Sequence, residues 1–262
     1  MNRTILAING VDSSGATGLA ADIKTFQTFR VYGVTAVTAV LAQDTQGTQA
    51  CHPVPMEVVG QQIEAVALDI PIHGVKTGFL GSASNVQITA SLLEAYDLAK
   101  LLVVDPFIVS STGAPLLDDK AQELLKALIL PKAYILCAKS SEAAVLTGRK
   151  VGDMAEAKGA AEALFAMGPK NVVLTGGQLE GPRALDLWFD GTHHHVFDAL
   201  RVPTRNTLGA GCTFSAILAA LAVKGLGVGE SVEKAKQYIA KAVQHPFQIG
   251  HGQGPLNHSV PM

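Results

Sequence analysis

A loop with two glycines, residues 206–213, runs directly into the apolar stretch 214–223, which predicts a buried helix beginning beside Cys212. The first turn of a helix carries unpaired backbone N–H groups and a partial positive charge, so it binds anions, above all phosphate. Gly209 and Gly211 would let the backbone approach a ligand closely, and the helix dipole is expected to lower the pKa of the Cys212 thiol. A base beside an anion site suits the transfer of a phosphoryl group to a hydroxyl. The alternative is an ordinary helix cap that buries a cysteine.

Short strand-like runs alternate with longer helical patterns along the chain. Apolar runs of strand length, each expected to be covered on both faces, lie at residues 4–9, 34–41, 74–78, 101–105, 134–138 and 172–175. Helical patterns lie at residues 18–29, 55–68, 84–96, 119–130, 141–146, 154–167, 213–224 and 228–243. This alternation predicts an α/β fold with a central, mostly parallel sheet flanked by helices on both faces, in one domain over residues 1–262. A turn signal at residues 190–192 predicts a hairpin between 184–189 and 195–200.

Glycine or polar clusters follow most of these strands. They lie at residues 10–18, 43–47, 77–81, 105–113, 139–142 and 175–178. Because ligands of open parallel sheets bind beyond the carboxyl ends of the strands, we expect these loops to share one cleft. The first cluster matches neither the G-x-G-x-x-G spacing of dinucleotide sites nor the P-loop, so a bound nucleotide would be held in another way.

The charge balance argues against several classes of protein. The formal net charge is −2 and 16% of residues are charged, without the basic stripe that nucleic acids or membrane surfaces would need. No apolar segment approaches the length of a membrane span, and no signal-peptide pattern precedes the first strand. The three cysteines are widely spaced and match no zinc or disulfide pattern. We therefore expect a cytoplasmic protein that binds neither nucleic acid nor membranes.

Short motifs spread over almost the whole chain carry a resemblance to a known family. They lie at residues 10–15, 21–24, 31–33, 42–47, 75–78, 104–106, 115–117, 204–207, 209–213 and 250–258. On these motifs the chain resembles the ribokinase-like superfamily and, within it, the hydroxymethylpyrimidine/phosphomethylpyrimidine kinases of thiamine biosynthesis. The resemblance implies a ribokinase-like fold and a homodimer. It also implies phosphorylation of 4-amino-5-hydroxymethyl-2-methylpyrimidine and of its monophosphate, with ATP and Mg²⁺.

The same resemblance implies roles on the phosphate side of the cleft. Gly209, Ala210 and Gly211 would form the anion site for the γ-phosphate. Cys212 stands where most members of the superfamily have an aspartate base, and a thiolate there could accept the proton of the substrate hydroxyl.

On the substrate side, the resemblance implies that Gln43 bonds the pyrimidine edge, because its amide supplies both a donor and an acceptor. Gly10, Asp22 and Val109 would border the same pocket. Two structural alternatives stay open here. Gln43 could be a strand-end amide satisfied within the protein, and Asp22 could merely hold the first helix by bonding backbone or Lys24.

On the nucleotide side, the resemblance implies contacts from Lys139, Thr175 and Gln178, and it makes Asp105 and Glu142 the candidates to organise Mg²⁺ through water. The alternative for Asp105 is a turn that ends a strand. The alternative for Glu142 is a helix N-terminal charge favoured by the dipole.

The chain departs from the family's pattern on that nucleotide side. Lys139 replaces an asparagine, Thr175 and Ser111 replace lysines, and Ala210 replaces a threonine. The loss of two cations should weaken ATP binding or transition-state stabilisation. We hypothesise that Lys139 restores one positive charge from a new position.

Two other functions remain open on the sequence alone. A pyridoxine or pyridoxal kinase acts on a similar flat heteroaromatic hydroxymethyl compound, and the Gln43 and Cys212 signals do not separate the two. The lost lysines also leave room for a non-catalytic pyrimidine-binding homologue with a degraded ATP site.

Overall fold

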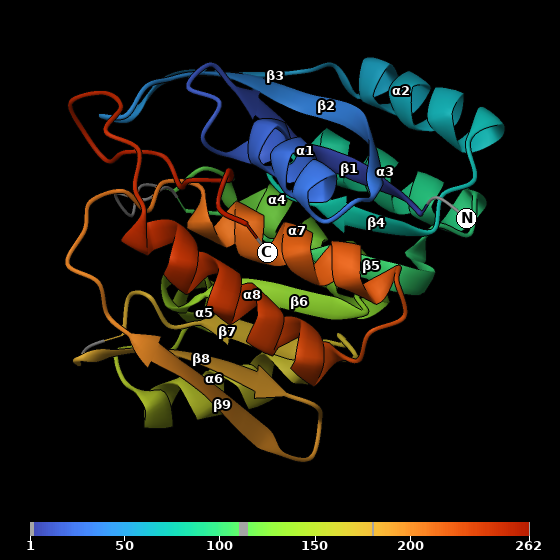
Figure 1. The fold of residues 1–262 in the computed structure, drawn as a ribbon. Coiled ribbons are helices and arrows are strands. Elements are labelled where there is room, and N and C mark those ends of the chain that lie inside the picture. Colours follow the sequence, from blue (N-terminus) through green and yellow to red (C-terminus); the bar gives the residue numbers. More distant parts are fainter. Residues whose placement is uncertain (1–2, 110–114, 180, 262) are drawn as a thin grey trace.

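The computed structural model describes residues 3–109, 115–179 and 181–261, and its strands form one nine-stranded sheet (Figure 1). The order across the sheet is β3-β2-β1-β4-β5-β6-β7-β8-β9. The strands are β1 Thr4–Asp12, β2 Tyr32–Gln43, β3 Thr48–Pro53, β4 Gly74–Thr77, β5 Leu102–Val104, β6 Ile135–Lys139, β7 Val172–Thr175, β8 Arg183–Phe189 and β9 His194–Leu200. The strands between β2 and β7 in this order run parallel, whereas β3, β8 and β9 pair antiparallel. The predicted mainly parallel sheet and its C-terminal hairpin are therefore confirmed.

Helices cover both faces of this sheet. They are α1 Gly18–Thr28, α2 Met56–Asp69, α3 Ala83–Ala95, α4 Asp119–Leu124, α5 Ser140–Thr147, α6 Met154–Phe165, α7 Ala210–Ala222 and α8 Val228–Gln244. One face packs against α1, α7 and α8, which lie in front of the sheet in Figure 1, and the other packs against α2 to α6. Within the described residues, no helix combines the length and the hydrophobicity that crossing a membrane requires.

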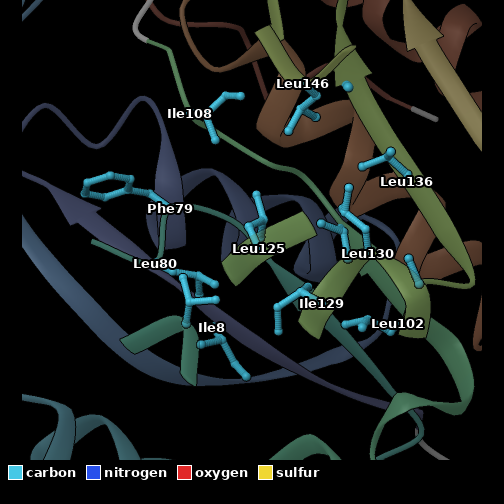
Figure 2. Close-up of a cluster of buried hydrophobic side chains, with 14 of the residues drawn as sticks. Ile8, Phe79, Leu80, Leu102, Ile108, Leu125, Ile129, Leu130, Leu136 and Leu146 are labelled. Atoms are coloured by element: carbon cyan, nitrogen blue, oxygen red, sulfur yellow. The ribbon is translucent and has the colours of Figure 1, made fainter. Parts of the chain in front are cut away.

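The central strands send alternate side chains into two hydrophobic cores. In β1, Ile5 and Ala7 face the core beneath α1, α7 and α8, whereas Leu6 and Ile8 face the core beneath α2 to α6. Figure 2 shows the second of these cores, with Ile8 among its side chains. Each fully buried aliphatic side chain of this kind stabilises the fold by roughly 1.5–3 kcal/mol.

Strand β3 is an element that the sequence pattern does not predict. Nearly all of its residues are exposed at the edge of the sheet, so it lacks the apolar alternation that marks a strand. Its antiparallel partner β2 runs two residues beyond the predicted end at Leu41, and Val40 on that strand is half exposed. The expectation that β2 is covered on both faces is wrong for this outer part of the sheet.

Two helices differ from their predicted bounds by more than two residues. The predicted helix 119–130 is α-helical only to Leu124 and continues as a π-helical turn from Leu125 to Ile129. Helix α7 begins at Ala210, three residues before its predicted start. Gly209, in the left-handed conformation with a φ of 88°, sets up this start, and its carbonyl accepts the N–H of Thr213 at 2.9 Å.

Candidate functional site

A cavity of about 900 Å³ opens where the parallel strands end and the loops converge. Its lining includes most of the residues predicted to contact the phosphates and the nucleotide, and one residue predicted to contact the substrate. They are Gln43, Lys139, Thr175, Gln178, Gly209, Ala210, Gly211 and Cys212. The other predicted residues are not among those that line this cavity, and each of them is buried. They are Gly10, Asp22, Asp105, Val109 and Glu142.

The loop at the start of α7 is held by close backbone packing. A Cβ atom on Gly209 would fall 1.9 Å from the carbonyl oxygen of Ala16, so no side chain fits there. The N–H of Ala210 bonds the carbonyl of Thr207 at 3.1 Å. The N–H groups of Gly211 and Cys212 precede the first helical bond, which Thr213 makes, so they are available to an anion.

The Cys212 thiol differs from its sequence-based expectation. The side chain is buried, and burial raises the pKa of the thiol well above its usual range, with Asp105 and Asp22 adding to the effect. Lys76 and the N–H of Gly18 oppose this shift but do not reverse it. The prediction that the helix dipole lowers this pKa is wrong for the ligand-free protein, because the desolvation of the thiol outweighs the dipole.

Beneath Cys212 lies a buried chain of charged and polar groups. Lys76, from the centre of the sheet, places its Nζ 2.7 Å from Asp22 Oδ1 and 3.9 Å from Asp105 Oδ2. Asn9 donates to Asp22 Oδ2 at 2.9 Å, and Ser215 Oγ donates to Asp105 Oδ2 at 3.0 Å. Burial by itself would lower the pKa of Lys76, but the two carboxylates raise it, so the ammonium group stays charged.

This chain settles what Asp22 contacts within the protein. Its partners are Lys76 and Asn9, whereas Lys24 donates to the carbonyl of Gly15 at 2.7 Å. The alternative in which Asp22 bonds Lys24 is therefore wrong, and Asp22 ties α1 to β4 instead. Lys76 lies in the motif at residues 75–78, but the sequence assigned it no role, although a lysine inside an apolar strand is a signal in its own right.

Lys139 and Glu142 form a compact pair at the start of α5. Glu142 accepts the backbone N–H of Lys139 at 2.9 Å and its Nζ at 3.1 Å. The Lys139 Nζ lies 5.0 Å from the centre of the Phe107 ring, and the Cε would lie 3.2 Å from a Cβ placed on Gly211. The lysine therefore brings a positive charge to the cavity beside the anion loop.

Gln43 lies at the end of β2 with both ends of its amide engaged. Its Nε2 lies 3.3 Å from Asp12 Oδ2 and 3.4 Å from Thr17 Oγ1. Its Oε1 accepts the hydroxyl of Thr48 at 2.6 Å. Asp12 lies in the motif at residues 10–15, but the sequence assigned it no role, and Thr48 was missed because the strand that carries it was not predicted.

The C-terminal tail forms part of the cavity wall. Thr45 Oγ1 accepts the N–H groups of His251 and Gly252 at 3.1 and 3.0 Å, and the carbonyl of Thr45 accepts Gln253 N–H at 2.7 Å. Further along, His258 Nε2 lies 2.8 Å from Thr213 Oγ1 in the first turn of α7. The tail thus joins the turn between β2 and β3 to the anion loop.

A model of the phosphomethylpyrimidine kinase family matches residues 12–257, nearly the whole chain. The chain belongs to this family. The hydroxymethylpyrimidine/phosphomethylpyrimidine kinase of Bacillus subtilis is 39% identical over 97% of this chain and 93% of its own length. The thiamine biosynthesis bifunctional protein ThiED of Geobacter sulfurreducens is 38% identical over 97% of this chain, which spans 52% of that longer protein.

Solved structures of ribokinase-like kinases share the fold. A phosphomethylpyrimidine kinase from Clostridium difficile superposes with a TM-score of 0.81, at 34% identity, over 92% of this chain and all of that one. The pyridoxal kinase of Bacillus subtilis, solved as an ADP complex, superposes with a TM-score of 0.90, at 31% identity, over 99% of this chain and 98% of that one. The predicted ribokinase-like fold is therefore confirmed.

The cavity also contains a cation to which the sequence assigned no role. Lys236, from α8, lines the cavity, and its Nζ lies 3.0 Å from Asp186 Oδ2. Asp186 Oδ1 accepts the N–H of Gly176 at 2.9 Å, so the pair also fixes the loop after Thr175. One lysine among several on an amphipathic helix gives no sequence signal of such a position.

Gln178, on the same loop, makes hydrogen bonds within the protein through its side-chain oxygen. Its Oε1 accepts the N–H of Ser141 and the hydroxyl of Ser140, both at 3.2 Å, which ties the loop to the start of α5. The Ser111 replacement lies outside the described residues.

The two acidic candidates for Mg²⁺ do not present a direct coordination site. Both carboxylate oxygens of Glu142 bond Lys139, and Asp105 Oδ2 bonds Ser215. Among the described residues, no group of three or more His, Cys, Asp or Glu side chains could hold a metal ion. Neither carboxylate lines the cavity, so any contribution of Asp105 or Glu142 to a bound Mg²⁺ would have to pass through water.

Proposed function

We propose that this protein phosphorylates 4-amino-5-hydroxymethyl-2-methylpyrimidine with ATP, and then phosphorylates the monophosphate to the diphosphate, in thiamine biosynthesis. The observation that carries the proposal is the shared cavity, in which the Gly209–Cys212 loop and Lys139 lie in one chamber with Gln43. The kinases of this family that it matches along nearly its whole length support the same activity.

In the proposed first step, the hydroxymethyl oxygen attacks the γ-phosphorus, the bond to the β-phosphate oxygen breaks, and the hydroxyl proton passes to Cys212 Sγ. The N–H groups of Gly211 and Cys212 and the Lys139 ammonium group offset the negative charge on the transferred phosphoryl group. A thiol can accept a proton only after losing its own. Because burial raises the pKa of Cys212, the thiolate is a minor form at neutral pH, and its fraction limits this step.

In the proposed second step, a phosphate oxygen of the bound monophosphate is the nucleophile. That oxygen needs little deprotonation, so Cys212 matters less to the second step than to the first. Mg²⁺, when bound with ATP, would neutralise charge on the β- and γ-phosphates, with Asp105 and Glu142 acting through water.

Product analysis tests the proposal directly. The purified protein is incubated with Mg-ATP and, separately, the hydroxymethylpyrimidine, its monophosphate and pyridoxal, and the products are identified by mass spectrometry. We expect the pyrimidine monophosphate and diphosphate. Cys212→Ala should slow formation of the monophosphate far more than formation of the diphosphate. Equal losses on the two steps would contradict the role given to Cys212.

Pyridoxal kinase activity is the second candidate. Pyridoxal kinase structures superpose on this fold with TM-scores of about 0.9, including one that holds both AMP-PCP and pyridoxal. Phosphorylated pyridoxal as the sole product would make this candidate the function.

Three further properties complete the proposal. The continuous nine-stranded sheet supports one domain over residues 1–262. We propose a homodimer on the family resemblance, to be tested by light scattering. We also propose a cytoplasmic location, which is consistent with unpaired thiols at Cys51, Cys137 and Cys212.

A further inference from the structure

The position of Gln43 in the cavity is fixed by its own backbone. The Gln43 carbonyl accepts the hydroxyl of Ser13 at 2.8 Å, and the Gln43 N–H donates to the hydroxyl oxygen of Ser13 at 3.0 Å. The end of β2 is thereby tied to the loop that follows β1. These backbone bonds do not determine the orientation of the Gln43 side-chain amide, whose NH₂ and oxygen ends could face either neighbour.

Asp12 sets that orientation. Its buried carboxylate accepts the N–H of Thr17 at 2.7 Å and also the hydroxyl of Thr17, so it acts as an acceptor. Only the NH₂ end of the Gln43 amide can therefore face it, and Nε2 lies 3.3 Å from Asp12 Oδ2 and 3.4 Å from Thr17 Oγ1. Thr17 Oγ1 itself donates to Asp12 Oδ2, so the two oxygens lie together beside the NH₂ group, which has a second N–H to offer a ligand.

Thr48 completes the arrangement from the other side. Its hydroxyl donates to Gln43 Oε1 at 2.6 Å, and a carbonyl oxygen has a second lone pair. A rotation of the amide by 180° would set Oε1 against the Asp12 carboxylate and leave two acceptors facing each other. The amide therefore keeps one N–H donor and one oxygen acceptor, in a fixed order, for a ligand in the cavity.

We propose that Asp12 and Thr48 are specificity-determining residues: by orienting the Gln43 amide, they select a heteroaromatic ring with an acceptor nitrogen next to an exocyclic amine. This inference rests on the proposed function. The 4-aminopyrimidine edge has that order, with ring N3 as acceptor and the 4-amino group as donor. The 4-oxo analogue has the reverse order, with N3–H as donor and the oxygen as acceptor. Asp12 and Thr48 act through Gln43 and need not touch the substrate.

The test is a ratio of two kcat/KM values, for 4-amino-5-hydroxymethyl-2-methylpyrimidine and for its 4-oxo analogue, each measured on the same protein preparation. Thr48→Val keeps the shape of the side chain and removes its hydroxyl. We expect the preference for the amino compound to fall about fivefold, the effect of one neutral hydrogen bond. Asp12→Asn, which can face either end of the amide, should reduce the preference at least as far. A ratio is unaffected by the fraction of protein that is folded.

Thr35→Val is the matched control, because Thr35 is a half-buried threonine on β2, the strand that carries Gln43, and is not one of the residues lining the cavity. It should leave the ratio unchanged. Equal losses of kcat/KM for both compounds in Thr48→Val and Asp12→Asn would assign these residues a structural role only and overturn the inference.

Failure of the proposed function gives a different result. If the wild-type protein phosphorylates neither pyrimidine, that function is wrong, and the ratio is then taken from dissociation constants measured by calorimetry. A preference for the amino compound that Thr48→Val weakens would still support the inference. No preference, or no binding of either compound, would overturn it.

Discussion

Replacing Lys76 with methionine should lower the free energy of unfolding by about 3–5 kcal/mol at pH 8, the usual cost of breaking a buried ion pair by removing one partner. Methionine fills a similar volume, so the loss comes from charge and not from a cavity. At separations of 2.7 and 3.9 Å, the attractions of the ammonium group to Asp22 and Asp105 are roughly 6 and 4 kcal/mol at an effective dielectric constant of about 20. The variant removes both attractions and leaves two buried carboxylates without their cation.

The sign of the pH dependence follows from those carboxylates. In the wild-type protein, burial already raises the pKa of Asp22, and Lys76 opposes the rise. Without Lys76, the folded-state pKa of Asp22 should rise well above that of the unfolded chain. The folded variant then holds a proton that the unfolded chain has released, so its stability is greatest at low pH and falls as the pH rises through the folded pKa of Asp22.

Urea unfolding at pH 5 and pH 8 measures both effects. The deficit of Lys76→Met should be smaller at pH 5, and adding Asp22→Asn should recover part of it at pH 8. Lys132→Met is the control, since Lys132 pairs with the exposed Glu94 at the surface and should change stability little. A deficit below about 1 kcal/mol at pH 8, or one that neither pH nor Asp22→Asn alters, would refute the description of these residues as one buried charge network.

Three other predictions follow from the site. Because burial raises the pKa of Cys212, the rate of the first phosphorylation step should still be rising with pH at about pH 9, whereas Cys212→Asp should give a rate that changes little between about pH 6 and about pH 9. A flat wild-type profile would show that thiolate formation does not limit the step. Lys139→Ala should lower kcat roughly 100-fold or more, and Lys139→Arg should retain much of the rate; unchanged kinetics in Lys139→Ala would reject the compensating charge. Burial and Lys24 lower the pKa of His258 to about 4, so its contribution to stability is complete above about pH 6.5 and falls by up to ~3 kcal/mol towards pH 4. His258→Gln should flatten this part of the stability curve, and an unaltered curve would contradict the assignment.

The sequence predicts those parts of the fold that local patterns determine. Strand β1 and helix α8 combine an apolar repeat with a typical length, so their positions could be predicted to within a few residues. Strand β3 could not, because an exposed edge strand needs no apolar face. Its absence from the prediction also hid Thr48, which orients Gln43.

The residues of the site likewise divide into those that a local sequence pattern reveals and those that it does not. The anion loop is contiguous in sequence, so Gly209 and Cys212 could be recognised from their neighbours alone. The partners of Lys76 come from two other elements, and no local pattern links them. The predicted direction of the Cys212 pKa shift was wrong for the same reason. The helix dipole is a local property that the sequence shows, whereas burial depends on the whole fold.

The C-terminal tail that holds the turn at Thr45 is synthesised after all of the described strands, and this affects the order in which the protein can fold. Residues 250–258 follow every described strand in the chain, so during synthesis the sheet can assemble before the ribosome has made this portion of the cavity wall. Until then the turn at Thr45 lacks the N–H donors of His251, Gly252 and Gln253 that hold it against the rest of the site. A nascent chain can therefore form its sheet first and complete its binding chamber only later, which separates the assembly of the sheet from the acquisition of ligand recognition.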